Sequence, residues 1–191
     1  MVPMMGNKVA MSPSVFENEH IAIAYGMGIT AENVAAQWQV SREDQDAFAL
    51  ASHQKAMAAI QAGYFDAEIS PYDIIAKSAD LAGGKIITRQ KRFSQDEGPR
   101  ADSSAEGLAK LKPVFKARGS VTAGNSSQMS DGAGAVLLAS EQAVKDYGLT
   151  PLARFVSFSV AGVPPEIMGI GPIAAIPKAL KQAGLTQDQM D

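Results

Sequence analysis

The segment that most constrains the fold is Ala133–Ala139, which is apolar without interruption. A strand with one face in water alternates apolar and polar residues, whereas a strand covered on both faces is continuously apolar. The sequence therefore predicts a strand here that needs neighbours on both sides. Directly after it, Ser140 is expected to cap a helix that runs to Tyr147 and ends at Gly148.

The same alternation of strands and helices is expected on either side of this segment. Residues 120–123 are a short strand candidate, and residues 154–160 alternate apolar and polar side chains as a half-buried strand does. A turn rich in glycine and proline, residues 162–172, leads to a helix that Gly184 closes, and Thr186 with Gln189 begins a further helix or turn. Residues 120–191 are therefore predicted to be α/β layers.

The first 119 residues are predicted to form a separate, more helical α+β lobe. Thr30 is expected to cap a helix that reaches Gln39, and Ser41 a longer helix that Gly63 ends. The longer helix carries a stripe of small and apolar residues that is expected to pack inward, made of Ala47, Phe48, Ala51, Ala58 and Ala62.

The rest of this lobe is predicted to be mostly irregular. Residues 68–75 contain a proline and are expected to form an edge strand, whereas residues 76–99 are expected to be irregular. Ser103 and Glu106 are spaced as a capping box for a short helix that Pro113 terminates. Residues 1–20 are expected to be a loop or a strand remnant.

Composition excludes several classes of function. There is no apolar run near 18 residues, so no membrane span is expected, and no basic n-region, so no secretory signal. The sequence contains no cysteine and two histidines, His20 and His53, of which His53 is interpreted as a structural residue on the exposed side of its helix. A disulfide framework, a thiolate or histidine-rich metal site and a cysteine nucleophile are therefore not expected within these residues. The expected location is the cytoplasm.

A basic island lies within an otherwise acidic chain. Residues 81–118 carry nine basic and four acidic side chains, while the whole chain has a formal net charge of −3. Such an island attracts phosphorylated ligands, although an ordinary solvated surface has the same appearance. Nucleic acid is disfavoured as a partner, because the chain as a whole is acidic and few aromatic residues interleave with the island.

Five stretches, in order, resemble the motifs of the thiolase family, whose members make or break 3-oxoacyl-CoA thioesters. The stretch at residues 121–133 resembles the family's VTAGNxSxxxDGAA signature. The other four resemble the family's MGxTAENVA, SRxxQDxFA, LRPxF and MGxGP motifs, and they lie at Gly28–Ala35, Ser41–Ala49, Leu111–Phe115 and Met168–Pro172.

The resemblance implies an incomplete thiolase-like fold of class α/β with three regions. Residues 1–119 would be the family's loop lobe, which binds coenzyme A and makes oligomer contacts. Residues 120–149 would be the last part of the N-terminal half, and residues 150–191 the start of the C-terminal half. The partners implied are CoA or acyl-CoA as substrate and further copies of the chain, as a homo-oligomer (dimer or tetramer); no bound cofactor is implied.

The resemblance also implies five residues at the ligand. Ser127 matches a serine that contacts the pantetheine arm of CoA, and Ser126 lies beside it on a loop of small residues that permits close approach. Arg100 stands where an arginine faces the nucleotide, and a guanidinium can both stack on adenine and pair with phosphate. Met27 and Met168 match apolar positions of the acyl pocket. On residue type alone, a satisfied polar turn, a surface arginine and core methionines are the alternative explanations of these positions.

The chemistry implied is a reversible Claisen condensation through a cysteine acyl-enzyme. The nucleophilic cysteine is expected upstream of Met1, and the family's remaining catalytic motifs downstream of Asp191, so no catalytic residue is assigned to this chain. Gly26 stands where short-chain biosynthetic members have a histidine, which favours a degradative or broad-chain enzyme. The alternative is a non-catalytic CoA-binding or assembly module derived from a thiolase, which the absence of cysteine also fits.

Overall fold

The computed structural model describes residue 13 and residues 25–130 and 132–190, which form two compact units. One unit holds the described residues up to Ser41, Pro113–Val121 and the described residues from Met129 onward; the other holds Arg42–Lys112 and Thr122–Gln128. The loop or strand remnant expected over residues 1–20 lies outside the described residues apart from Pro13, and so does His20.

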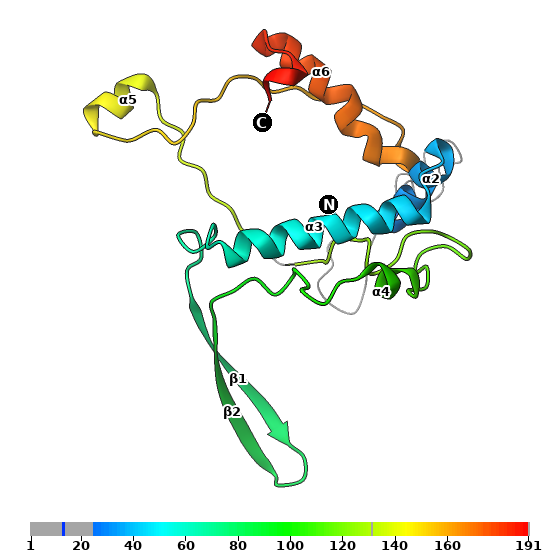
Figure 1. Ribbon diagram of the computed structural model, residues 1–191. Helices are drawn as coiled ribbons and strands as arrows, with labels where there is room; N and C mark the ends of the chain where they lie inside the picture. Colours follow the sequence, from blue (N-terminus) through cyan, green and yellow to red (C-terminus); the bar gives the residue numbers. More distant parts are fainter. Residues whose placement is uncertain (1–12, 14–24, 131, 191) are drawn as a thin grey trace. The chain divides into compact units, whose positions relative to one another are not determined.

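The first unit begins with helix α2, Met27–Trp38, which starts earlier than the sequence predicts (Figure 1). Thr30 is not its cap. Gly26 is the N-cap residue and gives no side-chain bond, while the buried Thr30 hydroxyl donates to the carbonyl oxygen of Met27 at 2.8 Å. A threonine inside the first turn can bond back to the preceding turn in this way, which removes it from the capping position.

Helix α3, Arg42–Gln61, forms the scaffold of the second unit. Its start and its end near Gly63 agree with the prediction, and Gly63 has the left-handed φ of 74° that favours glycine. The inward face was predicted wrongly, because Ala47, Phe48 and Ala58 are exposed and Asp46 is the buried residue. Polar contacts rather than the alanine stripe decide which face of α3 is covered.

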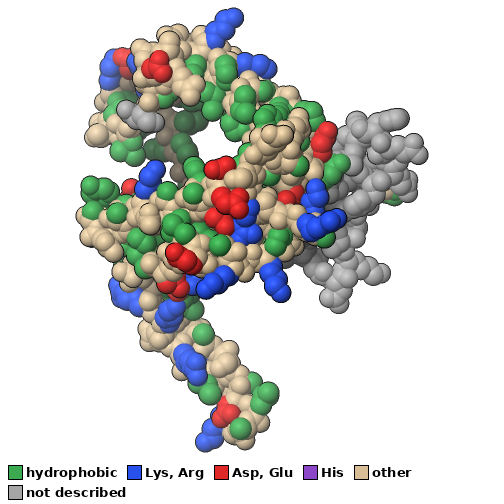
Figure 2. All heavy atoms as spheres, turned by 45° about the vertical axis from the view of Figure 1, so that its right-hand side comes forward, with side chains coloured by type: hydrophobic (Ala, Val, Ile, Leu, Met, Phe, Trp, Pro, Cys, Tyr) green, Lys and Arg blue, Asp and Glu red, His purple; other side chains and the backbone are tan. Residues whose placement is uncertain are grey.

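The second unit also contains a long hairpin where residues 76–99 were predicted to be irregular. Strand β1, Tyr72–Asp80, pairs antiparallel with β2, Lys85–Phe93, in a register that sets Tyr72 opposite Phe93. The turn is stabilised by the Asp80 carboxylate, which accepts from the backbone N–H groups of Ala82 and Gly83, and by Gly84 at φ 61°. The hairpin extends away from α3 (Figure 1), and Lys and Arg side chains are spread along it (Figure 2).

Helix α4, Ala105–Ala109, follows the hairpin and packs on α3. Its cap is Ser104, whose hydroxyl accepts from the N–H of Gly107 at 3.0 Å, and not Ser103 as the spacing to Glu106 predicted. The buried Leu108 side chain anchors this short helix. The shift of one residue is within the usual uncertainty of helix ends.

Three predicted strands do not form a ladder in the described part of the chain. Residues 120–123, 133–139 and 154–160 have no strand assignment there, and the only sheet pairs β1 with β2. A strand needs a neighbour for its backbone groups, and none of the described segments supplies one. The apolar side chains Val136, Leu137 and Leu138 are accordingly 83–84% exposed.

The helices predicted in the last third of the chain do form. In α5, Glu141–Asp146, the Ser140 hydroxyl accepts from the N–H of Ala143, as the cap prediction requires. The 3₁₀ helix η1, Pro165–Ile170, leads into α6, Gly171–Ala183, which ends at Gly184 with φ 67°. A capping box between Thr186 and Gln189 begins η2, Gln187–Gln189. None of the helices in the described ranges is long and apolar enough to cross a membrane.

The buried residues show what organises each unit. Of the six buried residues in the described part of the chain, Leu108 and Val121 are apolar, and the other four are polar or charged, namely Thr30, Glu32, Asp46 and Thr122. Thr30, Glu32 and Val121 belong to the first unit, and the other three belong to the second. Buried polar groups are tolerated only where they find partners. The partners of these residues therefore define the structural centre of each unit.

Candidate functional site

The loop Thr122–Gln128 folds into a tight turn around a buried threonine. Thr122 is 0% exposed, and its hydroxyl accepts from the N–H groups of Gly124 and Asn125 at 3.2 and 3.3 Å. The side-chain oxygen of Asn125 in turn accepts from the N–H of Thr122 at 2.7 Å. These local bonds fix the loop backbone without a regular element.

The two serines of this loop are held differently. The Ser126 hydroxyl donates to the carbonyl oxygen of Thr122 at 2.6 Å and is half-buried, whereas the exposed Ser127 hydroxyl donates to the carbonyl oxygen of Gln128 at 3.1 Å. Both protons are thus directed to the loop itself. The oxygen lone pairs of both serines remain suited to accept from a ligand N–H, since a hydroxyl has two acceptor positions.

A close contact beneath the loop explains why it contains glycine. A Cβ added at Gly124 would lie 2.5 Å from side-chain methyl carbons of both Leu108 and Leu111. The loop backbone therefore rests directly on these two leucines, of which Leu108 is buried. Glycine is the residue that allows such an approach.

Arg100 lies exposed in the same unit and is fixed at both its ends. Its Nε and Nη2 donate to the Asp102 carboxylate at 3.1 and 2.8 Å, and its backbone N–H donates to Nδ1 of His53 at 3.2 Å. Hydrogen bonding and charge attraction from Asp102 raise the pKa of Arg100, and the same contacts lower the pKa of Asp102. His53, predicted to be structural on the exposed side of its helix, is half-buried and anchors this segment.

A second contact joins the Arg100 segment to the serine loop. A Cβ at Gly98 would lie 2.6 Å from the side-chain nitrogen of Gln128, so the Gln128 side chain covers the backbone at Gly98. Gly98 is two residues before Arg100, and Gln128 directly follows Ser127. The structure thus brings the segments of three of the five predicted ligand residues, Arg100, Ser126 and Ser127, against each other.

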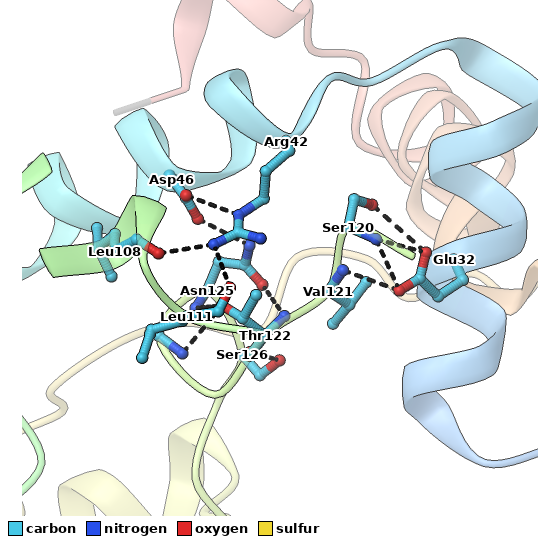
Figure 3. A network of polar contacts seen from close by, with 11 residues as sticks. Glu32, Arg42, Asp46, Leu108, Leu111, Ser120, Val121, Thr122, Asn125 and Ser126 are labelled. Atoms are coloured by element: carbon cyan, nitrogen blue, oxygen red, sulfur yellow. Dashed lines mark hydrogen bonds and ion pairs between the residues drawn. The ribbon is translucent and has the colours of Figure 1, made fainter. Parts of the chain in front are cut away.

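Buried carboxylates hold polypeptide segments in both units (Figure 3). In the first unit, Glu32 accepts from the N–H groups of Ser120 and Val121 at 3.0 and 2.8 Å, respectively. In the second, Asp46 accepts from the side-chain N–H of Asn125 at 2.9 Å and from Nε of Arg42 at 2.7 Å. Each carboxylate therefore fixes a segment about 80 or more residues away in the sequence.

Comparison with known proteins identifies the family. The model of the thiolase N-terminal domain matches residues 7–142, and that of the thiolase C-terminal domain matches residues 149–191. This chain belongs to the thiolase family. Its resemblance to thiolase motifs is thereby confirmed over nearly the whole sequence.

Curated thiolases are similar to the chain at about half of its positions. It is 52% identical over 187 residues to rat peroxisomal 3-ketoacyl-CoA thiolase B, covering 97% of this chain and 43% of that protein. It is 50% identical over 185 residues to the 3-ketoacyl-CoA thiolase of Bacillus subtilis, covering 96% of this chain and 46% of that protein. The chain thus spans less than half the length of these relatives.

Solved thiolase structures match the fold. The dimeric peroxisomal thiolase of Saccharomyces cerevisiae matches with a TM-score of 0.78 and 41% identity, covering 98% of this chain and 45% of that one. Human mitochondrial 3-ketoacyl-CoA thiolase in complex with CoA matches with a TM-score of 0.76 and 42% identity, covering 98% and 44%. The predicted α/β class is therefore confirmed as part of the thiolase fold.

The two predicted methionines of the thiolase acyl pocket lie in the first unit. Met27 is the first residue of α2 and Met168 lies in η1; they are 66% and 43% exposed. These two elements pack together, since the side chain of Asn33 donates to the carbonyl oxygen of Glu166 at 3.0 Å. Neither methionine is a core residue of the unit, which removes the simplest structural explanation for them.

Sequence reasoning missed the residues that hold the loop rather than face the ligand. Arg42, Asp46 and Asn125 were assigned no role, although they lie within the thiolase motifs. The spacing of Arg42 and Asp46 by four residues on one helix indicates an ion pair. It does not indicate that Asp46 also binds a residue 79 positions later in the chain.

Proposed function

We propose that this chain carries the CoA-handling part of a thiolase reaction, the reversible thiolytic cleavage and Claisen condensation of 3-oxoacyl-CoA with CoA. The observation that carries the proposal is the contact between Gly98 and Gln128, which sets the Arg100 segment beside the serine loop. CoA combines a phosphorylated nucleotide with an amide-containing arm, so its recognition needs a cation and small polar groups close together.

Each of these residues has a role that its geometry supports. Ser126 and Ser127 present acceptor oxygens to the two amide N–H groups of the pantetheine arm, and the small residues around them leave room for it. Arg100 uses Nε and Nη2 for Asp102, which leaves Nη1 and the flat face of the guanidinium for phosphate and adenine. Met27 and Met168 would form apolar walls for the acyl group.

The acyl-transfer step itself needs a thiolate nucleophile, and the sequence contains no cysteine. The chain alone is therefore expected to bind CoA without catalysing thiolysis. Isothermal titration with CoA tests binding, and thiolysis of acetoacetyl-CoA by protein from a thiolase-free host tests turnover. Failure to bind CoA, or turnover proportional to the protein, would overturn this proposal.

The absence of cysteine also favours a second candidate, a non-catalytic CoA-binding or assembly module derived from a thiolase. Binding without turnover is expected from both. The DNA that flanks this reading frame separates them: codons for the family's cysteines and its Gly-His-Pro motif would favour the enzyme. Flanking DNA without such codons would favour the module.

The finer features of the whole protein are proposed as follows. Residues 1–119 serve as the loop lobe, 120–149 complete the N-terminal half and 150–191 begin the C-terminal half. The enzyme is a cytoplasmic homo-oligomer with a degradative, β-oxidation role. The solved yeast relative is described as dimeric, which supports association, whereas several relatives are named for the peroxisome or mitochondrion. Fluorescent tagging in the source organism tests the location.

A further inference from the structure

Arg42 joins helix α3 to the end of helix α4. Its Nη2 donates to the carbonyl oxygens of Leu108 and Leu111 at 2.6 and 3.1 Å, while its Nε donates to Asp46 at 2.7 Å (Figure 3). The last carbonyl groups of a helix lack partners within the helix. The Leu108 carbonyl oxygen already accepts from the N–H of Leu111 at 3.0 Å, so the guanidinium adds a second bond at the end of α4. The side chains of Leu108 and of Leu111, which lies two residues beyond α4, support Gly124 from below.

Asp46 extends this connection into the loop. Its Oδ2 accepts from Arg42 and its Oδ1 accepts from Nδ2 of Asn125 at 2.9 Å, and the opposite side of that amide accepts from the N–H of Thr122. The two charged side chains are only 21% and 11% exposed. Hydrogen bonds with ionised partners are stronger than neutral ones, and the half-buried setting strengthens them further.

The chain of contacts ends at the serine whose position matters for CoA. Thr122 is held at its N–H by Asn125 and at its carbonyl oxygen by the hydroxyl of Ser126. A displacement of Asn125 would therefore move the backbone group to which Ser126 is bound. No step of this relay depends on an apolar contact, so its geometry is set by charge and hydrogen-bond direction.

We propose that Arg42 and Asp46 are positioning residues that hold the loop Thr122–Gln128 in the conformation that binds CoA, an inference that rests on the proposed function. In this role they act on the loop and not on the ligand. Arg42 sets the carboxylate of Asp46, Asp46 orients the Asn125 amide, and that amide fixes Thr122 and with it Ser126. The guanidinium fork is needed, because a lysine ammonium is a point charge that does not reproduce the directions of its bonds to Asp46, Leu108 and Leu111.

An exchange of partners tests this relay without changing its composition. In Asp46→Asn, the new side-chain NH2 group would point either at the NH2 group of Asn125 or at Arg42, and one of the two bonds would be lost. In Asn125→Asp, two carboxylates would face each other. In the double variant, the amide at position 46 can donate to the carboxylate at position 125, which still accepts from the Thr122 N–H. The hydrogen bond between positions 46 and 125 is thereby restored, with the negative charge moved from position 46 to position 125. Arg42→Lys tests the fork, and Glu141→Gln removes an exposed ion pair of equal helical spacing as the control.

Two measurements on the full chain give separate answers. Hydrogen exchange followed by mass spectrometry reports the loop amides, and titration with CoA reports affinity. Each single variant is expected to accelerate exchange over residues 122–128 and to weaken CoA binding, each by about tenfold, as loss of one charge-assisted bond would. The double variant should recover most of both, and the control should change neither.

Unchanged exchange in all three of these relay variants would overturn the relay. Faster exchange with unchanged CoA affinity would overturn its positioning role. A double variant as impaired as the single variants would show that the bond between positions 46 and 125 is not what holds the loop. If the unmodified chain fails to bind CoA, the proposed function fails, and the exchange cycle still decides whether Arg42 and Asp46 hold the loop.

Discussion

The carboxylate of Glu32 accepts a hydrogen bond from the backbone N–H of Val121 at 2.8 Å. The same carboxylate accepts from the N–H of Ser120, and Glu32 is 4% exposed. It packs so closely on Gly119 that a Cβ there would overlap the carboxylate oxygens. A buried charge with this set of donors holds residues 119–121 against helix α2 within the first unit.

We predict that Glu32→Gln destabilises the first unit by about 1–3 kcal/mol, because one side of the amide would present a donor to a backbone N–H that needs an acceptor. Trp38 is in α2 and is the only tryptophan, so urea unfolding followed by its fluorescence reports this unit. Glu141→Gln, which removes an exposed carboxylate, is the matched control. An unfolding midpoint equal to that of the unmodified chain would contradict the importance of this contact.

Gly28 and Phe115 give a second test in the same unit. A Cβ at Gly28 would overlap the ring of Phe115, so Gly28→Ala forces the ring to move and is expected to cost about 1–3 kcal/mol. Combined with Phe115→Ala, the loss should be smaller than the sum of the two single losses, because alanine lacks the Cγ and Cδ atoms that the added Cβ meets. Gly134→Ala is the control, since nothing lies within 4 Å of its added Cβ. A double variant whose loss equals the sum of the two single losses would show that the ring is not the obstacle.

These contacts show that the motif stretches bind one another. The sequence alone identified the stretches but not the contacts between them. Glu32 and Gly28 come from one stretch, Val121 and Asn125 from another, and Phe115 from a third. Each lies next to a residue of a different stretch, in pairs separated by some 80 positions. Spacing along the chain predicts neighbours in one helix or turn, and it contains no information about such distant partners.

The helices and strands show the same difference between local signals, which the sequence contains, and distant partners, which it does not. The caps at Ser140, Gly184 and Thr186 were predicted correctly because each bonds within its own helix turn. The hairpin was missed although its signal was present, since Gly83 and Gly84 separate two β-branched runs. Residues 133–139 were predicted to be a strand because they are continuously apolar. They form no ladder, because a ladder also requires a partner segment.

The pair of Arg100 with Asp102 predicts a competition for the guanidinium. The pKa of Asp102 is lowered by Arg100, so the pair is complete above the ordinary carboxyl pKa of 3.8 and is lost only as pH falls through the lowered value. At neutral pH Asp102 therefore competes fully with a CoA phosphate for Arg100.

Asp102→Asn is expected to tighten CoA binding by several-fold, and Arg100→Ala to weaken it by about tenfold, with a smaller dependence on salt. Asp96→Asn changes the charge of the basic island by the same amount and is the matched control. Titration calorimetry at neutral pH and two salt concentrations measures all four proteins. Equal tightening by Asp96→Asn would show that the effect comes from net charge and not from the pair. An unchanged affinity in Arg100→Ala would show that Arg100 is a surface residue with no role in CoA binding.

The apolar segment 133–139 predicts association of the isolated chain. Its side chains Val136, Leu137 and Leu138 are 83–84% exposed, and Phe155 and Phe158 are 76% and 69% exposed. Exposed apolar segments with unpaired backbone groups are sites of edge-to-edge association. We therefore expect light scattering to give a mass above the 20.0 kDa of one chain.

Leu137→Asp is expected to lower that mass, because a charge in the segment opposes contact between copies. Leu81→Asp is the control, since Leu81 is 95% exposed at the hairpin turn and lies outside the segment. Near-ultraviolet circular dichroism of Trp38 shows whether the first unit is well packed. A sharp 20.0 kDa peak from the unmodified chain, with a strong dichroism signal and cooperative melting, would contradict association through the segment. Because an assembly-independent fold is what a stand-alone module requires, that result would favour the CoA-binding module over the enzyme.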